Sequence, residues 1–335
     1  MYQFIRASAH ATGLPEKSVH AVITSPPYWG LRKYAGEQGI AWDEVGYAPM
    51  AGLPQITIPA MRCGLGEEPT PEAYIGHLIL VMREMWRVLR DDATCWVNLG
   101  DSYAGSWGNY GGQNRGQGKQ RQIVNGSLVG SKAYEGKEQW RPPTSNGTPG
   151  LKPKDLVQIP ARFALAAQAD GWWVRSDIIW AKPNPMPESV TDRPTKAHEY
   201  IYLLAKSPRY FYDGEAIKEP STGQIGAAAS FKRETKDCLI PGQSAIQHRT
   251  DRDDNYDTGT RNKRSVWSVP TSPYHGSHFA VWPEALVEPM VLAATSARGV
   301  CPQCGAPWRR VMEKVGEIRT RWKEGAAVVD AQWGG

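Results

Sequence analysis

Cysteine is scarce in this chain of 335 residues: the five thiols are Cys63, Cys95, Cys238, Cys301 and Cys304. An odd and mostly scattered set argues against the disulfide framework of a secreted protein and favours a reducing compartment. Residues 1–24 lack the apolar run of a signal peptide, and no later stretch approaches the roughly 20 apolar residues of a membrane span. We therefore expect a cytoplasmic protein with no membrane partner.

Net charge is also small. The chain has a formal charge of +5 and is 41% hydrophobic, so it can bury a substantial core as one large α/β domain with elaborations or as two smaller units. Residues 105–154 hold eight Lys or Arg and two Glu, among Gly, Gln, Asn and Ser without periodicity. This composition predicts a long loop or a mobile insertion, and its cations suit a polyanionic partner.

Hydrophobic periodicity predicts alternating strands and helices. A β-branched run predicts a buried strand over Val19–Thr24 that stops at a double proline. Helical spacing from Pro71 predicts a helix over 71–89, and turn-like residues 90–92 lead into a strand over 93–99. The later predicted elements are a helix over 156–169, a strand over 172–181, a hairpin of 200–205 with 210–212, and a helix over 283–294.

The tetrapeptide Ser25, Pro26, Pro27 and Tyr28 stands at the carboxyl end of the first predicted strand. An exocyclic amine of cytosine or adenine is a poor nucleophile because its lone pair is delocalised, and two in-plane acceptors can localise that lone pair. The Ser25 hydroxyl oxygen and the Pro26 carbonyl oxygen are candidate acceptors, on a backbone that the prolines fix. The Tyr28 ring offers a stacking surface worth about 1–3 kcal/mol, which offsets part of the cost of flipping a base.

Taken alone, such a tetrapeptide is more often a proline-rich turn. Here it follows a buried strand, with Thr24 before it and Trp29 after it, and further segments follow in order. The segments are 24–29, 98–103, 179–184, 192–195, 198–200, 264–267, 278–283 and 286–289. Together they resemble the permuted class of site-specific DNA amino-methyltransferases, which modify cytosine N4 or adenine N6, across roughly residues 18–308.

The resemblance implies a Rossmann-like α/β sheet with helices on both faces, loop-rich DNA-recognition insertions, S-adenosylmethionine as methyl donor and double-stranded DNA as substrate. It implies that the cofactor lies beside Ser25, Asp101, Phe279, Pro283 and Leu286. An N-cap is the alternative role for Asp101, and an ordinary capped helix packed on the sheet is the alternative for the last three.

The implied DNA contacts lie at strand ends and in a recognition region. They are Trp29, Lys182, Asn184, Arg261, Lys263 and Arg264. A solvated surface cluster is the alternative for the last three, and Trp180, beside Lys182, is equally suited to the core.

Serine at the first motif position favours N4-cytosine over N6-adenine methylation, because the adenine enzymes usually carry Asp there. Methylation at carbon 5 needs a Cys nucleophile, commonly after Pro, and the chain has no Pro-Cys pair. The alternatives are an N6-adenine enzyme, a non-catalytic DNA-binding remnant that has lost the cofactor, and an RNA-directed methyltransferase.

One segment of the family pattern is missing where the permuted order places it. A glycine-rich cofactor loop, Asp-Pro-Phe-x-Gly-x-Gly, is expected after the helix over 283–294, but Cys301 and Cys304 stand there, in a segment resembling half of a zinc ribbon. Two thiolates supply half of a tetrahedral zinc site, and two reduced surface thiols are the alternative. We expect a sheet that is incomplete at its C-terminus, with the remainder either on a separate polypeptide or lost from a degenerate gene. The resemblance also allows a companion restriction endonuclease.

Six segments make up the expected organisation. They are a catalytic part (1–104), a basic loop (105–154), a continuation of the sheet (155–213), a target-recognition region (214–272), a cofactor-side helix (273–298) and a partial zinc-ribbon insertion with a tail (299–335).

Overall fold

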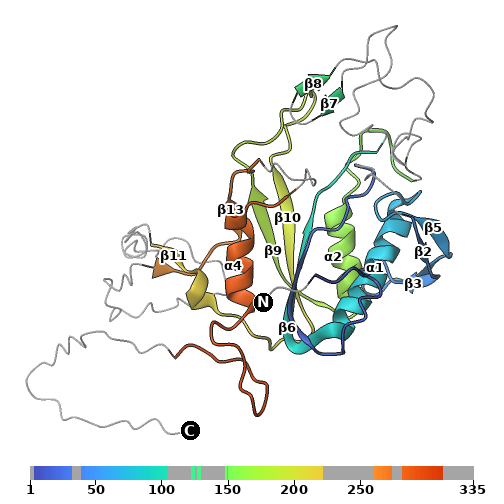
Figure 1. Ribbon diagram of the computed structural model, residues 1–335. Coiled ribbons are helices and arrows are strands. Elements are labelled where there is room, and N and C mark those ends of the chain that lie inside the picture. The colour runs from blue at the N-terminus through green and yellow to red at the C-terminus, as the bar shows by residue number, and fades with distance from the viewer. Residues whose placement is uncertain are drawn as a thin grey trace, which may run out of the picture.

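A five-stranded mixed sheet forms the centre of the protein. The computed structural model describes residues 4–31, 39–104, 122–124, 127–129, 148, 150–221, 260–273 and 281–311. The strands lie in the order β1 (Val19–Thr24), β6 (Leu89–Leu99), β10 (His198–Ala205), β9 (Trp173–Ala181) and β13 (Val266–Ser268) (Figure 1). β1 is parallel to β6 and β13 to β9, whereas β10 runs antiparallel to both of its neighbours.

Helices cover both faces of this sheet (Figure 1). α1 (Pro71–Val88) and α2 (Ile159–Ala169) pack on one face, and α4 (Glu284–Ala294) packs on the other. Successive side chains of a strand point to opposite faces, and accordingly Val97 of β6 joins the core under α1 and α2 while Trp96 joins the core under α4. The prediction of an α/β sheet with helices on both faces is confirmed.

The start of α1 follows from its sequence. The Thr70 hydroxyl accepts a 3.1 Å hydrogen bond from the Ala73 N–H, and Pro71 occupies the first turn, where its missing N–H costs nothing. The helix buries Tyr74, Leu78 and Met82 among other residues on the sheet side. The predicted helix over 71–89 is confirmed to within one residue at its end.

Residues 90–92 do not form the predicted turn. They lie inside β6, where Val19 pairs with Leu89 and Ala21 pairs with Thr94, so β6 carries extra residues in an irregular stretch. Their charged side chains form ion pairs: Asp91 pairs with Lys17 and Lys206, and Arg90 pairs with Asp92. Turn-like composition was a misleading signal because ion pairs satisfy these residues within a strand.

The predicted hairpin of 200–205 with 210–212 is also wrong. β10 is paired along both edges, with β6 on one side and β9 on the other, so no edge remains for the following segment. The Phe211 N–H donates to the Asp92 carbonyl instead, at 2.8 Å. The hydrophobic pattern identified the strand but not its partners.

Small two-stranded sheets surround this centre, and none of them was predicted. They are β2 (Ile40–Trp42) with β5 (Met61–Cys63), β3 (Val45–Tyr47) with β4 (Ile56–Ile58), β7 (Gln122–Val124) with β8 (Ser127–Val129), and β11 (Glu219–Pro220) with β12 (Thr260–Arg261), while η2 (Gly214–Ile217) is a short 3-10 helix. β3 and β4 pack closely on α1 at Gly76. A Cβ there would lie 2.9 Å from Ile58 Cγ1 and 3.1 Å from Val45 Cγ1, so this contact requires glycine.

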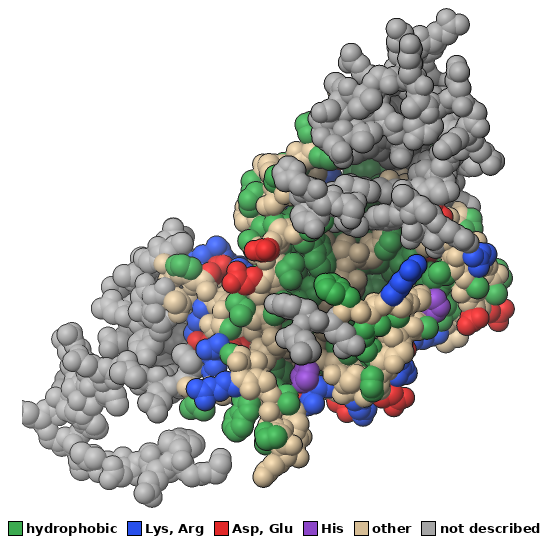
Figure 2. All heavy atoms as spheres, in the orientation of Figure 1, with side chains coloured by type: hydrophobic (Ala, Val, Ile, Leu, Met, Phe, Trp, Pro, Cys, Tyr) green, Lys and Arg blue, Asp and Glu red, His purple; other side chains and the backbone are tan. Residues whose placement is uncertain are grey.

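β1 occupies one edge of the sheet, and within the described residues no further strand pairs with it. Figure 2 shows hydrophobic side chains gathered over the middle of the viewed face, beside α4, with most charged side chains toward its borders. Val281, Val291 and Leu292, at or near α4, are each about two fifths exposed. Over the described ranges, no helix has the length and apolar character that a membrane crossing needs.

Candidate active site

Four strand ends meet at one edge of the central sheet. Because β10 runs antiparallel to its neighbours, its amino end lies beside the carboxyl ends of β6 and β9, with Tyr200 opposite Leu99 and His198 opposite Ala181. Ser25 follows β1, which runs parallel to β6. The sheet topology thus brings together side chains that are far apart in the sequence.

A series of hydrogen bonds links side chains across this edge of the sheet. The Ser25 hydroxyl donates to the Tyr28 hydroxyl oxygen at 3.3 Å, and the Tyr28 hydroxyl donates to Glu199 Oε2 at 2.6 Å. Asn98 Oδ1 lies 3.2 Å from the same tyrosine oxygen. Glu199 is held in turn by an ion pair with Lys182. Ser25 is exposed while Tyr28 is partly buried, so the chain leads from the surface inward.

In this series of hydrogen bonds each hydroxyl has one defined acceptor for its proton. A carboxylate can only accept, so Glu199 fixes the Tyr28 hydroxyl as a donor toward it. The tyrosine oxygen is then free to accept the Ser25 proton. Once the Ser25 hydroxyl hydrogen is engaged, the lone pairs of its oxygen remain available to a donor at the exposed side.

Burial and the Glu199 carboxylate both act on Tyr28. Desolvation, followed by the negative charge of Glu199, raises the pKa of the Tyr28 phenol well above its ordinary value. The phenol therefore keeps its proton throughout the neutral range and acts as a hydrogen-bond donor rather than as a base.

Gly100 forms the support beneath the Tyr28 ring. A Cβ at this position would lie 2.6 Å from Cε2 and 2.7 Å from Cδ2 of Tyr28, closer than real Cβ contacts come. The ring therefore rests directly on the backbone that follows β6. A glycine here sets the position of the ring.

Hydrogen bonds from neighbouring segments hold the backbone that follows β1 in place. Tyr74 of α1 donates from its hydroxyl to the Pro27 carbonyl at 2.8 Å, and the Gly30 N–H donates to the Gly66 carbonyl at 2.9 Å. The Trp29 indole N–H donates to the Glu68 carbonyl at 2.8 Å. Trp29 is 1% exposed, so this geometry supports a structural role for its ring rather than a contact with DNA.

Asp101 caps the region where α2 begins. Its Oδ1 accepts hydrogen bonds from the Ser102 N–H at 2.9 Å and the Ile159 N–H at 3.0 Å. Burial raises the pKa of the Asp101 carboxyl, while Lys196, 4.0 Å away, opposes the shift. This geometry favours the capping role over a direct contact with a ligand.

The expected cofactor-side helix lies close to the same edge. Trp282, just before α4, donates from its indole to Asn98 Oδ1 at 2.8 Å, and Pro283 is the N-cap of α4, without a side-chain cap. Leu286 is fully buried in the core under α4, as the packing alternative anticipated. Phe279 lies outside the described residues.

Two expected DNA-contacting residues after β9 are engaged within the protein. Lys182 lies 4.2 Å from the centroid of the Trp180 ring and pairs with Glu199. Asn184 bridges to Thr271, accepting from its N–H at 2.9 Å and donating to its carbonyl at 3.2 Å. Trp180 is buried, and its indole donates to the Val269 carbonyl at 2.8 Å.

The three basic candidates near β12 lie at the base of the expected recognition region. Arg261 and Arg264 both donate to Glu219 Oε1, at 2.9 and 2.8 Å, and Lys263 lies 5.1 Å from the centroid of the Trp267 ring. The Arg264 side chain is 67% exposed. Most of the region itself, residues 222–259, lies outside the described part of the chain.

Cys301 and Cys304 form a tight turn rather than two unrelated surface thiols. The Cys301 N–H donates to the Ala306 carbonyl and the Gly305 N–H donates to the Cys301 carbonyl, both at 2.8 Å. Backbone N–H groups of Cys304 and Gln303 lower the pKa of the Cys301 thiol. The turn fits half of a zinc site. The described residues supply no third ligand beside it.

Three residues of this site were not named as site residues from the sequence: Asn98, Glu199 and Tyr74. The first two stand in the ordered segments 98–103 and 198–200, at the strand ends where ligands commonly bind, and that position was the available signal. Tyr74 is one of many apolar positions of α1, and its hydroxyl contact with Pro27 has no sequence signal.

Comparison with known proteins agrees with these features. The N6_N4_Mtase family model, described as DNA methylase, matches residues 19–301. The chain belongs to this family of DNA methylases, and the resemblance drawn from the ordered segments is confirmed.

Relatives in this family are Type II methyltransferases. M.SmaI of Serratia marcescens is 37% identical over 290 residues, which cover 86% of this chain and 72% of M.SmaI. M.Cfr9I of Citrobacter freundii is 36% identical over 287 residues, which cover 84% of this chain and 68% of M.Cfr9I.

A solved structure named PvuII DNA methyltransferase (cytosine-N4-specific) aligns over 84% of this chain, with 12% identity and a TM-score of 0.42. The alignment covers 66% of the PvuII enzyme, so this chain spans slightly less than two thirds of that length.

Proposed function

We propose that this protein is a site-specific DNA methyltransferase that transfers a methyl group to the exocyclic amine of a flipped base, and that the base is cytosine, at N4. The observation that carries the proposal is the hydrogen-bond chain from Ser25 through Tyr28 to Glu199 at the convergent strand ends. Family membership supports the reaction class.

The hydrogen-bond chain explains how Ser25 acts as an acceptor. An amine nitrogen becomes nucleophilic when both of its N–H groups are drawn into a fixed plane by acceptors. Because Tyr28 engages the Ser25 proton, the serine oxygen presents lone pairs to one N–H. In the described part of the chain no donor reaches the Pro26 carbonyl, which is therefore free for the other N–H.

Tyr28 and Gly100 set the position of the base. The tyrosine ring rests on Gly100, and a base swung out of the duplex stacks on aromatic surface at this edge. S-adenosylmethionine supplies the methyl group on an activated sulfonium when it is bound. No cysteine nucleophile is needed, and the proton released from the amine passes to solvent.

The residues near α4 fit a cofactor only in part. The N-terminus of α4 has no side-chain cap, and its partial positive charge suits the carboxylate of a methionine moiety. Trp282 ties this end of the helix to Asn98. Leu286 is enclosed in the core, and Asp101 is occupied in capping, so neither supplies a direct contact in this arrangement.

In this proposal further polypeptide extends the cofactor site at the edge of β1, where no strand of the described residues pairs. The edge is formed by an apolar β-branched strand, and α4, which contacts β1, carries the exposed side chains of Val291 and Leu292. A strand added there would bury both. Only the similarity to Type II methyltransferases suggests a companion nuclease. No feature of the described residues favours one.

DNA recognition is assigned to residues 214–272 and the basic segment 105–154. Arg264 is the exposed cation at the base of the first segment, and eight Lys or Arg stand in the second. Phosphate contacts from such residues add affinity that falls with salt.

The test is methyl transfer from labelled S-adenosylmethionine to duplex DNA, followed by nucleoside analysis of the product. We expect N4-methylcytosine. N6-methyladenine would contradict the choice of base, and RNA labelled in preference to DNA would contradict the substrate class. Absence of both cofactor binding by calorimetry and transfer, in protein that binds DNA, would identify the non-catalytic remnant.

A further inference from the structure

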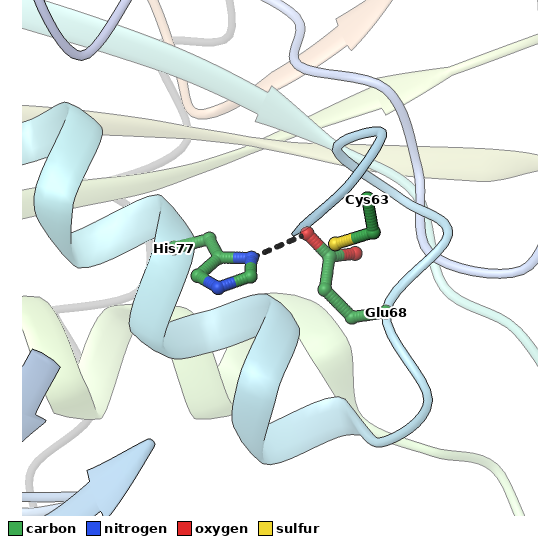
Figure 3. A group of neighbouring side chains, drawn as sticks. All are labelled: Cys63, Glu68 and His77. Carbon is green, nitrogen blue, oxygen red and sulfur yellow. Dashed lines mark hydrogen bonds and ion pairs between the residues drawn. The ribbon is translucent and has the colours of Figure 1, made fainter. Parts of the chain in front are cut away.

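Three side chains outside the candidate active site, Cys63, Glu68 and His77, form a second cluster of possible metal ligands (Figure 3). Cys63 ends β5, Glu68 lies in the loop that leads to α1, and His77 lies on α1. One ligand atom from each residue lies within 4.8 Å of the others, and His77 Nδ1 is 2.9 Å from Glu68 Oε1. The Glu68 and His77 side chains are completely buried.

The protein alone does not satisfy the polar atoms in this region. Glu68 Oε2 accepts from the Gly66 N–H at 2.7 Å, but His77 Nε2 and Glu67 Oε1 are buried without a hydrogen-bond partner in the described part of the chain. The Trp42 ring covers the imidazole, with 4.3 Å between centroids and 8° between planes. A buried carboxylate such as that of Glu68 is costly unless a cation or a donor compensates it.

We propose that Cys63, Glu68 and His77 bind one zinc ion. Thiolate, carboxylate and imidazole are the ligand types that zinc takes in proteins, at bond lengths of about 2.0–2.3 Å. Atoms that already lie within 4.8 Å of one another reach a common centre with small side-chain movements. A water molecule completes a tetrahedral site, and the Cys63 thiol releases its proton to solvent on binding.

The position of the site indicates a structural role. The Gly66 carbonyl accepts from the Gly30 N–H, and the Glu68 carbonyl accepts from the Trp29 indole. A metal that fixes the loop carrying Glu68 therefore also fixes the backbone immediately after Tyr28. The three ligands take no part in the hydrogen-bond chain through Ser25, Tyr28 and Glu199. The zinc proposal can therefore be tested independently of the catalytic assignment.

Cobalt(II) is the probe, because a cobalt–thiolate bond gives a near-ultraviolet absorption that identifies a cysteine ligand. The parent protein carries Cys301→Ser and Cys304→Ser, which remove the other candidate thiolate pair. We expect one equivalent of cobalt and the thiolate absorption in this parent. Cys63→Ser abolishes the absorption, and His77→Gln weakens cobalt binding by about tenfold or more, as loss of a ligand does.

His20→Gln is the matched control, because His20 is an exposed imidazole on β1 outside the cluster. This variant retains parental cobalt binding. Circular dichroism verifies that each variant is folded, and Glu68→Gln replaces any variant that is not. Zinc also raises the Tm of the parent and not that of Cys63→Ser. A folded parent without cobalt–thiolate absorption, or absorption that survives Cys63→Ser, overturns the proposal.

Discussion

The hydroxyl of Tyr28 donates a 2.6 Å hydrogen bond to Oε2 of Glu199, a residue on a strand that is distant in sequence. This contact joins the loop after β1 to the start of β10. It also determines the direction of the Ser25 hydroxyl, which donates to the same tyrosine oxygen. In the proposed mechanism Glu199 is thus a positioning residue for Ser25.

Tyr28→Phe tests this relationship. Loss of the hydroxyl leaves the Ser25 proton without its acceptor, so the serine can rotate and donate, and it presents its lone pairs to the amine less often. A neutral hydrogen bond such as that from Ser25 to Tyr28 is worth about 0.5–1.5 kcal/mol, which corresponds to roughly a 2- to 10-fold fall in methyl transfer. Single-turnover transfer rates measure the effect.

Glu199→Gln should lower transfer in the same direction, because an amide can donate to the tyrosine oxygen as well as accept from it. Combining the two substitutions should cost less than the sum of the single effects, since both act through one chain. Additive losses would contradict the coupling between Glu199 and Tyr28.

Gly100→Ala tests the support beneath the Tyr28 ring. A Cβ 2.6 Å from the ring must displace it, and overpacking of this kind costs about 1–3 kcal/mol of unfolding free energy. We expect transfer to fall by more than the fraction of unfolded protein explains, as measured by transfer assays beside urea unfolding. Gly39→Ala is the control, because its nearest contact would be an ordinary 3.8 Å. Equal activity in the two variants would contradict the assignment.

The Glu84 carboxylate makes the free energy of unfolding depend on pH. Its carboxylate accepts from Arg87 and from both the N–H and the hydroxyl of Thr12, and these bonds hold its pKa near 2, below the ordinary value of 4.5. A lowered pKa gives stability that is present above pH 4.5 and is lost as the pH falls toward 2. The difference in unfolding free energy between the wild type and Glu84→Gln should therefore shrink over this interval in urea titrations. A constant difference would contradict the role of the charge.

Arg264→Ala tests the expected recognition region. If the exposed guanidinium contacts one phosphate, the slope of log Kobs against log salt concentration becomes less steep by about one. Fluorescence anisotropy with a labelled duplex measures this slope. Arg175→Ala, at the opposite end of β9 from the site, should leave the slope unchanged. An unchanged slope for Arg264→Ala would remove this residue from the interface.

The main elements of the fold were predictable because their signals are local. Proline at the start of α1 and the β-branched run of β1 placed both elements correctly. The pairing of β10 with β6 and β9 was not predictable, because strand partners are set by tertiary contacts rather than by a hydrophobic run. The same limit produced the wrong turn at residues 90–92 and the wrong hairpin.

The candidate site likewise contains residues that the local sequence predicts and residues that only tertiary contacts bring in. Ser25 and Tyr28 were visible as a motif that follows a strand, but Glu199 joins them only because β10 runs antiparallel. Likewise Cys63 is 14 positions before His77 and has no recognisable metal-ligand spacing, and the two approach because β5 and α1 pack together. For Asp101 the sequence left a cap and a ligand contact open, and the hydrogen bond from the Ile159 N–H, which favours the capping role, depends on tertiary structure.

Single-turnover methyl transfer by Ser25→Ala tests the central claim most directly, with Ser18→Ala, an exposed serine just before β1, as the matched control. Both variants should retain the thermal unfolding midpoint of the wild type. We predict a fall of about 100-fold or more for Ser25→Ala and wild-type transfer for Ser18→Ala, in line with loss of an acceptor for charge that develops at the amine. Wild-type transfer by folded Ser25→Ala would contradict the central claim.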